Sequence, residues 1–288
     1  MDHRARPYRS VLYIPASKPR ALEKAKDLAV DAIIFDLEDA VPAEEKPAAR
    51  RLLAETLAAG GYGPRARIVR INGFDTAWGA EDLETLAAAR PEAILLPKVG
   101  DPGDVEALAR KLDARRETAG TTIWAMMETP AGILNAARIA AAPRMAGFVM
   151  GTNDLAKELG SRTRGGLATA LQTCLLAARA DGLVCVDGVY NAFRDDEGLA
   201  RECAEGRDFG FDGKTLIHPA QIEVANAAFA PSPDEIALAR RQIEAYEAAL
   251  REGQGVAVVD GKIVENLHVD TARATLAKAE AIASLQAA

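Results

Sequence analysis

Acidic, basic and amide side chains recur at the ends of short apolar segments of this sequence or just after them, where they could support metal or acid–base chemistry. Oxygen donors without thiols or imidazoles select a hard divalent cation, Mg²⁺ or Mn²⁺. An arginine facing such a metal suits a small substrate with carboxylate or carbonyl oxygens, because a guanidinium binds oxygen pairs in a fork. The residues in question are Asp36, Glu38, Asp39, Arg70, Asn72, Lys98, Glu128, Asn153, Asp154, Asp187 and His218.

Soft-metal and cysteine chemistry are poorly supported by the same sequence. The three cysteines, Cys174, Cys185 and Cys203, lack CxxC spacing, and the chain has 3 histidines. Cys174 and Cys185 stand among apolar residues, which is typical of buried thiols in a reducing cytoplasm. We therefore expect neither a zinc site nor a nucleophilic cysteine.

The elements that must position the polar residues are eight apolar runs that alternate with helical segments. The runs are continuously apolar, a pattern typical of parallel strands covered on both faces. Eight such units predict a TIM (β/α)₈ barrel, in which the carboxyl ends of the strands form the active-site face. A doubly wound open sheet is the alternative, but no run precedes a glycine-rich phosphate loop. The runs are 10–15, 32–37, 66–71, 93–99, 122–127, 147–151, 184–189 and 213–217.

The pattern changes near residue 230. We expect residues 1–230 to form the barrel with the active site and residues 231–288 to form a helix–hairpin–helix extension. The hairpin is predicted over 256–264, because Asp260–Gly261 suits a two-residue turn between apolar strands. Such an extension is too small to fold alone, so it must pack on this barrel or on a neighbouring subunit.

Length and charge exclude several classes of protein. The chain has 288 residues and a formal net charge of −7, with no basic stripe, which argues against a nucleic-acid partner. No apolar run approaches the ~20 residues of a membrane span. The N-terminal residues 1–7 are polar, without the apolar core of a signal peptide, so we expect a cytoplasmic protein.

Several segments together resemble one known family. They run from about Arg9 to Asn226 in the family's order, with one motif for each predicted strand. The chain is similar to the citrate lyase β-subunit family of the HpcH/HpaI aldolase superfamily, Mg²⁺-dependent enzymes that act on acyl thioesters. The segments are RSVLYIPASKPRALEKA, FDLEDAV, VRIN, LLPKV, METPAGILN, GTNDLA and GFDGKTLIHPAQIEVAN.

The resemblance implies a role for most of the polar residues. Glu128 and Asp154 would be the protein ligands of Mg²⁺, with Mn²⁺ as another option. Arg70 would hold the oxygens of an oxo-acid group and stabilise charge on a carbonyl. Asn153 and Asp154 would hold the substrate carboxylate.

The resemblance also implies contacts to CoA. Tyr13, Lys18 and Lys24 fall where relatives contact this cofactor, and Ile217 and His218 would border the pantetheine channel. The residues themselves allow a simpler interpretation, with Tyr13 in the core, both lysines on a solvated helix face and His218 shaping a turn.

The acidic cluster after the second apolar run has two interpretations as well. The resemblance implies that Glu38, with Asp36 and Asp39, organises metal-bound water from behind the metal ligands. At least one of the three carboxylates is also expected to accept hydrogen bonds from neighbouring loop N–H groups. Lys98 could pair with a barrel carboxylate.

The tail GVAVVDGKIVENL resembles the malyl-CoA lyase branch, in which a C-terminal hairpin covers the active site of the adjacent subunit, usually in a trimer. Lyases of this branch carry Asp where this chain has Glu265, and that acid would move the proton at the thioester α-carbon. A longer acid disturbs proton transfer. The tail and the segments MGTNDLAKEL and DGVYNAFRD are most similar to the thioesterase members of this branch. The resemblance therefore implies hydrolysis of (3S)-malyl-CoA, with Glu265 or Glu38 directing water, and a homotrimer or a dimer of trimers.

Three alternatives stay open. The closest is reversible C–C cleavage of malyl-CoA, β-methylmalyl-CoA or citramalyl-CoA to an acyl-CoA and an oxo acid. A second is an aldolase of free oxo acids that uses no CoA, which Lys18, Lys24 and the covering tail argue against. A third is a non-catalytic subunit that keeps the barrel. The presence of Glu128, Asp154 and Arg70 argues against that interpretation.

Overall fold

The computed structural model describes residues 6–287, which form two compact units. One unit is Tyr8–Phe229, and the other contains Arg6, Pro7 and the described chain from Ala230 onward. Residues 1–5, part of the N-terminal stretch used above to predict the location, lie outside the described residues.

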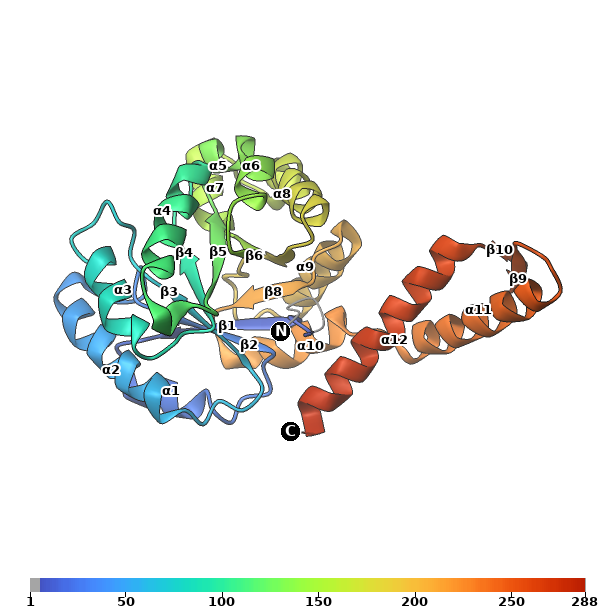
Figure 1. Cartoon of the computed structure of the whole chain (residues 1–288), viewed down its shortest axis with the longest axis horizontal. Helices are drawn as coiled ribbons and strands as arrows, with labels where there is room; N and C mark the ends of the chain where they lie inside the picture. Colours follow the sequence, from blue (N-terminus) through green and yellow to red (C-terminus); the bar gives the residue numbers. More distant parts are fainter. Residues whose placement is uncertain (1–5, 288) are drawn as a thin grey trace. The chain divides into compact units, whose positions relative to one another are not determined.

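The first unit is a closed barrel of eight parallel strands that follow one another in chain order (Figure 1). Each strand pairs with its sequence neighbour, and β1 pairs with β8 to close the barrel. The predicted TIM barrel is confirmed, and closure excludes the open sheet. The strands are β1 (Ser10–Pro15), β2 (Ala32–Asp36), β3 (Ala66–Arg70), β4 (Ala93–Leu96), β5 (Thr122–Met127), β6 (Met145–Met150), β7 (Val184–Asp187) and β8 (Gly213–Leu216).

Alternate residues of each strand point into the barrel and toward the helices. On β5, Trp124 and Met126 belong to the inner cluster, whereas Ile123 and Ala125 belong to the cluster between strands and helices. Trp124 fills the interior and lies 5.2 Å, centroid to centroid, from the ring of Tyr8. The amino-terminal part of the interior is therefore packed, and polar residues remain at the carboxyl ends.

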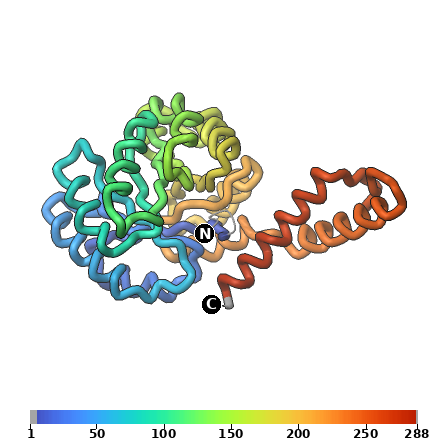
Figure 2. Tube along the Cα trace, viewed as in Figure 1, coloured from blue at the N-terminus to red at the C-terminus, as the bar shows by residue number. Residues whose placement is uncertain are grey.

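Helices follow the strands around the outside of the barrel (Figure 2). Between β5 and β6 the chain forms two short helices that meet at Asn135. The barrel α-helices are α1 (Pro19–Lys24), α2 (Lys46–Ala59), α3 (Gly79–Ala87), α4 (Pro102–Asp113), α5 (Pro130–Leu134), α6 (Ala136–Ala140), α7 (Thr152–Leu159), α8 (Ala168–Ala180), α9 (Asp196–Phe209) and α10 (Ile222–Phe229). Short 3₁₀ segments are Ala43–Glu45, Arg116–Thr118, Arg164–Leu167 and Pro219–Gln221.

The second unit consists of two helices and a hairpin. It contains α11 (Pro233–Arg251), β9 (Ala257–Val259), β10 (Lys262–Val264) and α12 (Asn266–Ala287). Asp260 and Gly261 have φ values of 50° and 74°, so both turn residues adopt the left-handed conformation that a type I′ turn requires. A small apolar core around Tyr246 and Val264 joins the hairpin to α11. Among the described residues, no helix is long and apolar enough to cross a membrane.

Candidate active site

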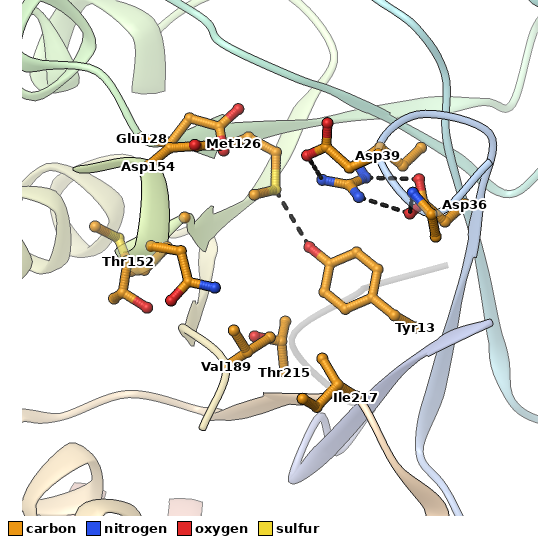
Figure 3. Close-up of a pocket in the computed structure, with 15 residues that line it drawn as sticks. Tyr13, Asp36, Asp39, Met126, Glu128, Thr152, Asp154, Val189, Thr215 and Ile217 are labelled. Carbon is orange, nitrogen blue, oxygen red and sulfur yellow. Dashed lines mark hydrogen bonds and ion pairs between the residues drawn. The ribbon is translucent and has the colours of Figure 1, made fainter. Parts of the chain in front are cut away.

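A cavity with polar and apolar lining residues lies at the carboxyl ends of the barrel strands and has a volume of about 420 Å³ (Figure 3). Fifteen residues line it, and many of them come from positions just after or at the end of a strand. They are Tyr13, Asp36, Asp39, Ala40, Arg70, Met126, Glu128, Met150, Gly151, Thr152, Asn153, Asp154, Val189, Thr215 and Ile217.

The strand pleat explains why these side chains meet. Ile34 and Ile68 point into the barrel, so Asp36 and Arg70, two residues further along, point the same way. Asp36 and Arg70 are register partners on β2 and β3. Glu128 follows Met126 on the inner face of β5 in the same manner. The polar cluster is therefore a continuation of the apolar interior.

Arg70 holds the centre of this cluster. Its Nε and Nη2 donate to the two carboxylate oxygens of Asp36 at 2.7 and 2.6 Å, a fork-to-fork pair. Its Nη1 lies 2.8 Å from Oε2 of Glu38 and 3.6 Å from Oδ2 of Asp39. Arg70 is 7% exposed, so its position is set by three carboxylates in a mostly dry environment.

Asp36 also organises the loop that follows β2. Its carboxylate accepts the backbone N–H of Glu38 at 2.9 Å and that of Ala40 at 3.2 Å. The side chain thus ties the loop to Arg70. This geometry fixes where Glu38 and Asp39 lie relative to the guanidinium.

Lys98 connects Glu38 to Glu128. Its Nζ donates to Oε1 of Glu38 at 2.7 Å, and its backbone N–H donates to Oε1 of Glu128 at 2.7 Å. Lys98 has φ 52°, a left-handed conformation that is costly for a residue with a side chain. Strain of this kind persists where the surrounding structure imposes it, often at functional sites.

Glu38 is held between two cations. Oε1 faces Lys98 and Oε2 faces Arg70, while the residue is 7% exposed. Burial raises the pKa of Glu38 above its usual value, and the two cations oppose that rise. Because both oxygens already face cations, Glu38 is better placed to hold Arg70 than to accept a proton.

Glu128 and Asp154 form the carboxylate pair of the cavity. Burial raises the pKa of Glu128 to about 7, and the charges of Glu38 and Asp154 add to this rise. Gly151 leaves the room that Glu128 needs, because a Cβ built there would lie 2.4 Å from Oε2. No group of three or more His, Cys, Asp or Glu side chains among residues 6–287 is arranged to hold a metal ion.

The donor set nevertheless suits a hard divalent cation. The two carboxylates offer oxygen ligands, and no histidine or cysteine lines the cavity. One oxygen of Glu128 is engaged by Lys98, which leaves Oε2 beside Gly151 for another partner. Glu128 and Asp154 would hold such a cation, and water and substrate oxygens would supply its other ligands.

Tyr13 occupies the inner face of β1, and its side chain lines the cavity. The ring centroid lies 5.0 Å from the guanidinium carbon of Arg70. The hydroxyl donates to Sδ of Met126 at 3.4 Å, and Figure 3 shows it directed toward that sulfur. Tyr13 is thus part of the Arg70 cluster.

The remaining predicted residues lie at the rim or away from the cavity. Asn153 lines the cavity and exchanges amide hydrogen bonds with Asn191, and Ile217 also lines it. His218 is exposed and stacks near the ring of Phe193, with centroids 4.7 Å apart.

Five residues of the prediction do not line this cavity: Glu38, His218, Lys18, Lys24 and Glu265. Lys18 and Lys24 are exposed at the two ends of α1, and Lys18 pairs with Glu45 at 3.5 Å. Glu265 belongs to the second unit, where it follows β10 and is exposed. The structure therefore places Glu128 and Asp154, the predicted metal ligands, around one cavity with Arg70. The lysines predicted to contact CoA lie elsewhere.

Some residues of the site were missed by the sequence analysis. Met126, Thr152 and Thr215 line the cavity, but their types carry no catalytic signal. Buried Gln221 joins two rim loops, because its Oε1 accepts the N–H of Ile217 at 3.0 Å and its Nε2 donates to the carbonyl of Tyr190 at 2.9 Å. A sequence signal for some of these residues exists, because a residue two positions after an inward-facing apolar residue of the same strand also points inward.

A second cavity, of about 330 Å³, shares Asp39 with the first. Glu38, Lys98 and Lys46 line it. Lys46 is buried, and its Nζ donates to the carbonyls of Leu37 and Glu38 and to the side chain of Asn72. Lys46 therefore fixes the backbone of the loop after β2 through these hydrogen bonds.

Comparison with known proteins identifies the family. The model of the HpcH/HpaI aldolase/citrate lyase family matches residues 9–219, and the model of the C–C bond lyases of the TIM-barrel fold matches residues 165–283. The chain belongs to the HpcH/HpaI aldolase/citrate lyase family. The resemblance inferred from the segments is thus confirmed, and the match contains every strand of the barrel.

Curated members of this family resemble the chain over its whole length. A (3S)-malyl-CoA thioesterase from Cereibacter sphaeroides (strain KD131) is 65% identical, with 100% of both chains covered. The citrate lyase subunit beta of Escherichia coli (strain K12) is 36% identical, with 97% of this chain and 95% of that protein covered. Both relatives are named as enzymes.

Solved structures of the family show the same fold. CitE from Mycobacterium tuberculosis in complex with magnesium, acetoacetate and coenzyme A has a TM-score of 0.78 at 35% identity, covering 96% of this chain and 99% of that chain. The citrate lyase beta subunit of M. tuberculosis with oxaloacetate and magnesium has a TM-score of 0.70 at 35% identity, covering 80% and 100%.

Proposed function

We propose that this protein hydrolyses (3S)-malyl-CoA to malate and CoA in the presence of Mg²⁺. The observation that carries the proposal is the 65% identity to a (3S)-malyl-CoA thioesterase over both full chains. The cavity supports it, because it combines a carboxylate pair with a buried arginine beside them. Such a site suits a small acyl group with carboxylate and hydroxyl oxygens.

The cavity residues divide the work as follows in this proposal. Glu128 and Asp154 hold Mg²⁺, which supplies positive charge for the substrate oxygens when it is bound. Arg70 holds the acyl oxygens, while Asp36 and Glu38 fix its guanidinium. Asn153 lies beside Asp154 at the start of α7, where the substrate carboxylate would be held.

The base that directs water is proposed to be Glu265 of a neighbouring copy. Glu38 is the other candidate, but each of its oxygens already faces a cation, Lys98 or Arg70. Glu265 is exposed and does not share these partners. A homotrimer, or a dimer of two trimers, in which the hairpin covers the adjacent active site would bring it to the substrate.

The outer face of the hairpin supports such an assembly. Val258 and Ile263 are cross-strand partners and are 67% and 62% exposed. An exposed apolar pair on a two-stranded ribbon suits a contact with another protein surface. We expect the mass in solution to be that of three or six chains, measured by light scattering.

A mixing experiment tests whether Glu265 acts across subunits. Arg70→Ala and Glu265→Gln variants, each inactive alone, are dissociated together and reassembled. Activity should return in the mixture, because some sites then combine an intact Arg70 with an intact Glu265. Continued inactivity of a properly assembled mixture would place both residues' functions within one chain.

Reversible C–C cleavage is the second candidate function. The match to the C–C bond lyase model over residues 165–283 favours it. In that reaction malyl-CoA gives acetyl-CoA and glyoxylate, and Glu265 protonates the enolate. β-Methylmalyl-CoA and citramalyl-CoA would be cleaved in the same way.

One assay separates the two functions. Purified protein is incubated with (3S)-malyl-CoA and Mg²⁺, and free thiol and glyoxylate are followed separately. Thiol without glyoxylate is the expected result. Glyoxylate appearing together with acetyl-CoA would instead establish the lyase. The variant Glu265→Asp should raise cleavage if the longer acid is what suppresses it, and Mn²⁺ should be compared with Mg²⁺ in the same assay.

A cytoplasmic location is also proposed. Cys174, Cys185 and Cys203 are buried free thiols, which are typical of a reducing compartment. Burial raises the pKa of Cys174 to about 12 and that of Cys203 to about 11, so neither is poised as a nucleophile.

A further inference from the structure

The hydroxyl of Tyr13 is a donor with a poor partner. It extends into the 420 Å³ cavity and donates to the thioether sulfur of Met126 at 3.4 Å. A thioether is a weak acceptor, so this contact leaves most of the hydroxyl's hydrogen-bonding capacity unused. A stronger acceptor that enters the cavity can replace the sulfur as the partner of this hydroxyl at little cost in free energy.

The hydroxyl is also close to the groups proposed to hold the acyl substrate. Met126, its present partner, stands two residues before Glu128 on the inner face of β5. A Cβ built on Gly151 would lie 3.1 Å from the methyl of Met126 and 2.4 Å from Oε2 of Glu128. The side chain of Met126 therefore bridges the space between the hydroxyl and the carboxylate pair (Figure 3).

The hydroxyl keeps its proton in this environment. Burial raises the pKa of Tyr13 well above its usual value, and although the charge of Arg70 lowers it, the charges of Asp36, Glu128 and Glu38 add to the rise. Arg70, 5.0 Å from the ring, lies on the same wall of the cavity. Tyr13 therefore presents a neutral O–H beside a fixed cation, an arrangement that stabilises a carbonyl oxygen as it gains charge.

We propose that Tyr13 is a catalytic residue whose hydroxyl donates a hydrogen bond to the thioester carbonyl oxygen of the substrate. The inference rests on the proposed function. In malyl-CoA the thioester carbon is two bonds from the carbinol carbon, so a malyl group held at Glu128 and Asp154 places its carbonyl within reach of the neighbouring wall. The hydroxyl then exchanges the sulfur of Met126 for the carbonyl oxygen.

The reaction balances without proton transfer from Tyr13. In hydrolysis the oxygen of water bonds to the carbonyl carbon, and the π electrons move to the carbonyl oxygen that Tyr13 contacts. The C–S bond then breaks, and the thiolate takes the proton that the base removed from water. In C–C cleavage the same oxygen carries the charge of the enolate. The role of Tyr13 is therefore the same for either reaction.

Tyr13→Phe tests the proposal, because it removes the hydroxyl and keeps the ring. We expect kcat for thiol release to fall by about 10²-fold, with KM within about threefold. Tyr62→Phe is the matched control, since its buried hydroxyl donates to the carbonyl of Leu22 at 3.1 Å outside the cavity, and its kcat should stay within about threefold of the wild type. An unchanged kcat in Tyr13→Phe would overturn the proposal and favour a packing contact with CoA.

Binding of a thioether analogue of malyl-CoA, in which methylene replaces the carbonyl, separates catalysis from structure. Tyr13→Phe should bind it with the wild-type Kd, because the analogue lacks the oxygen that the hydroxyl contacts. A weakened Kd that parallels the loss of kcat would mean that Tyr13 only shapes the site, against the proposal. If the wild type itself releases neither thiol nor glyoxylate from malyl-CoA, the proposed function fails, and this outcome is distinct from an unaffected variant.

Discussion

Two charge clusters in the barrel contain the same four types of charged residue, but one lines the cavity and the other lies between the strands and the helices. The inner cluster contains Asp36, Glu38, Arg70 and Lys98 with Asp39 at its edge, and the outer cluster contains Asp187, Glu202, Arg164 and Lys214 with Glu205 at its edge. In each, an arginine grips an aspartate at a strand end with two hydrogen bonds, and a lysine holds a glutamate. The residue types alone do not distinguish a site from a structural support.

The two clusters differ in the face of the strand on which the aspartate lies, a difference that a shift of one residue along the strand produces. Asp36 follows inward-facing Ile34 and so faces the cavity, whereas Asp187 follows Cys185, which faces the helices. Lys214 is fully buried and joins Asp187 at 3.0 Å and Glu202 at 2.6 Å. Lys98 is 56% exposed. The outer charges pair with one another between the strands and the helices. The inner charges also line a cavity that a ligand could enter.

The largest expected effect comes from the inner arginine. Arg70→Lys keeps one positive charge but loses the fork that grips Asp36 and the substrate oxygens. We expect kcat/KM for malyl-CoA to fall by about 10³-fold, equivalent to about 4 kcal/mol. Steady-state kinetics of thiol release, with circular dichroism to confirm folding, checks this. Activity within tenfold of the wild type would show that charge alone suffices at this position.

The outer lysine should affect stability instead of catalysis. Lys214→Met removes the cation between Asp187 and Glu202 and leaves buried carboxylate charge poorly compensated. We expect the free energy of unfolding to fall by about 3 kcal/mol, because breaking a buried ion pair from one side is costly. Urea denaturation measures the loss, and kcat of the folded variant should stay within threefold.

Lys98→Met is the matched control for that experiment. It removes the same amine from the more exposed pair, which is expected to contribute less than about 1 kcal/mol to stability. If Lys214→Met destabilises the protein no more than Lys98→Met, the distinction between the outer and the inner cluster does not hold.

The sequence predicted the barrel and the ends of its strands, but not the direction of each side chain. Continuous apolar runs, such as the one that contains Asp187, lack the alternation that distinguishes the two faces of a strand. Asp187 therefore entered the list of site candidates although its carboxylate lies in the outer cluster. Arg164 and Lys214 were missed, because a loop arginine and a lysine within a strand give no local sign of being partners.

The inner site was predictable to the extent that strand ends carry polar residues. Glu128, Asp154 and Arg70 follow apolar runs, and the structure gathers them around one cavity. The close association of Tyr13 with Arg70 and Met126 could not be predicted, since it depends on the curvature that brings β1, β3 and β5 to one interior. The position of Glu265 depends on assembly, which one chain does not determine.

Cys203, on α9, makes the stability of the protein near the outer cluster depend on pH. Burial raises its pKa from about 9 to about 11, with the charge of Lys214 opposing the rise. The protonated thiol is favoured in the folded state, so its contribution to stability is complete below pH 9 and is lost as the pH rises to 11. The loss is about 3 kcal/mol at most. The free energy of unfolding should fall less steeply over this range in Cys203→Ala than in the wild type, and equal slopes would exclude the thiol as a cause.

The smallest expected effect separates the backbone of Lys98 from its side chain. Lys98→Gly and Lys98→Ala both remove the amine from Glu38, but only glycine adopts φ 52° without strain. The glycine variant should therefore be more stable than the alanine variant by about 1 kcal/mol in urea denaturation. Both should retain the N–H that contacts Glu128 and lose kcat to a similar extent, because the lost amine is common to them. If the glycine variant recovered wild-type kcat, the strained backbone rather than the amine would limit catalysis, and the inner cluster would need no lysine.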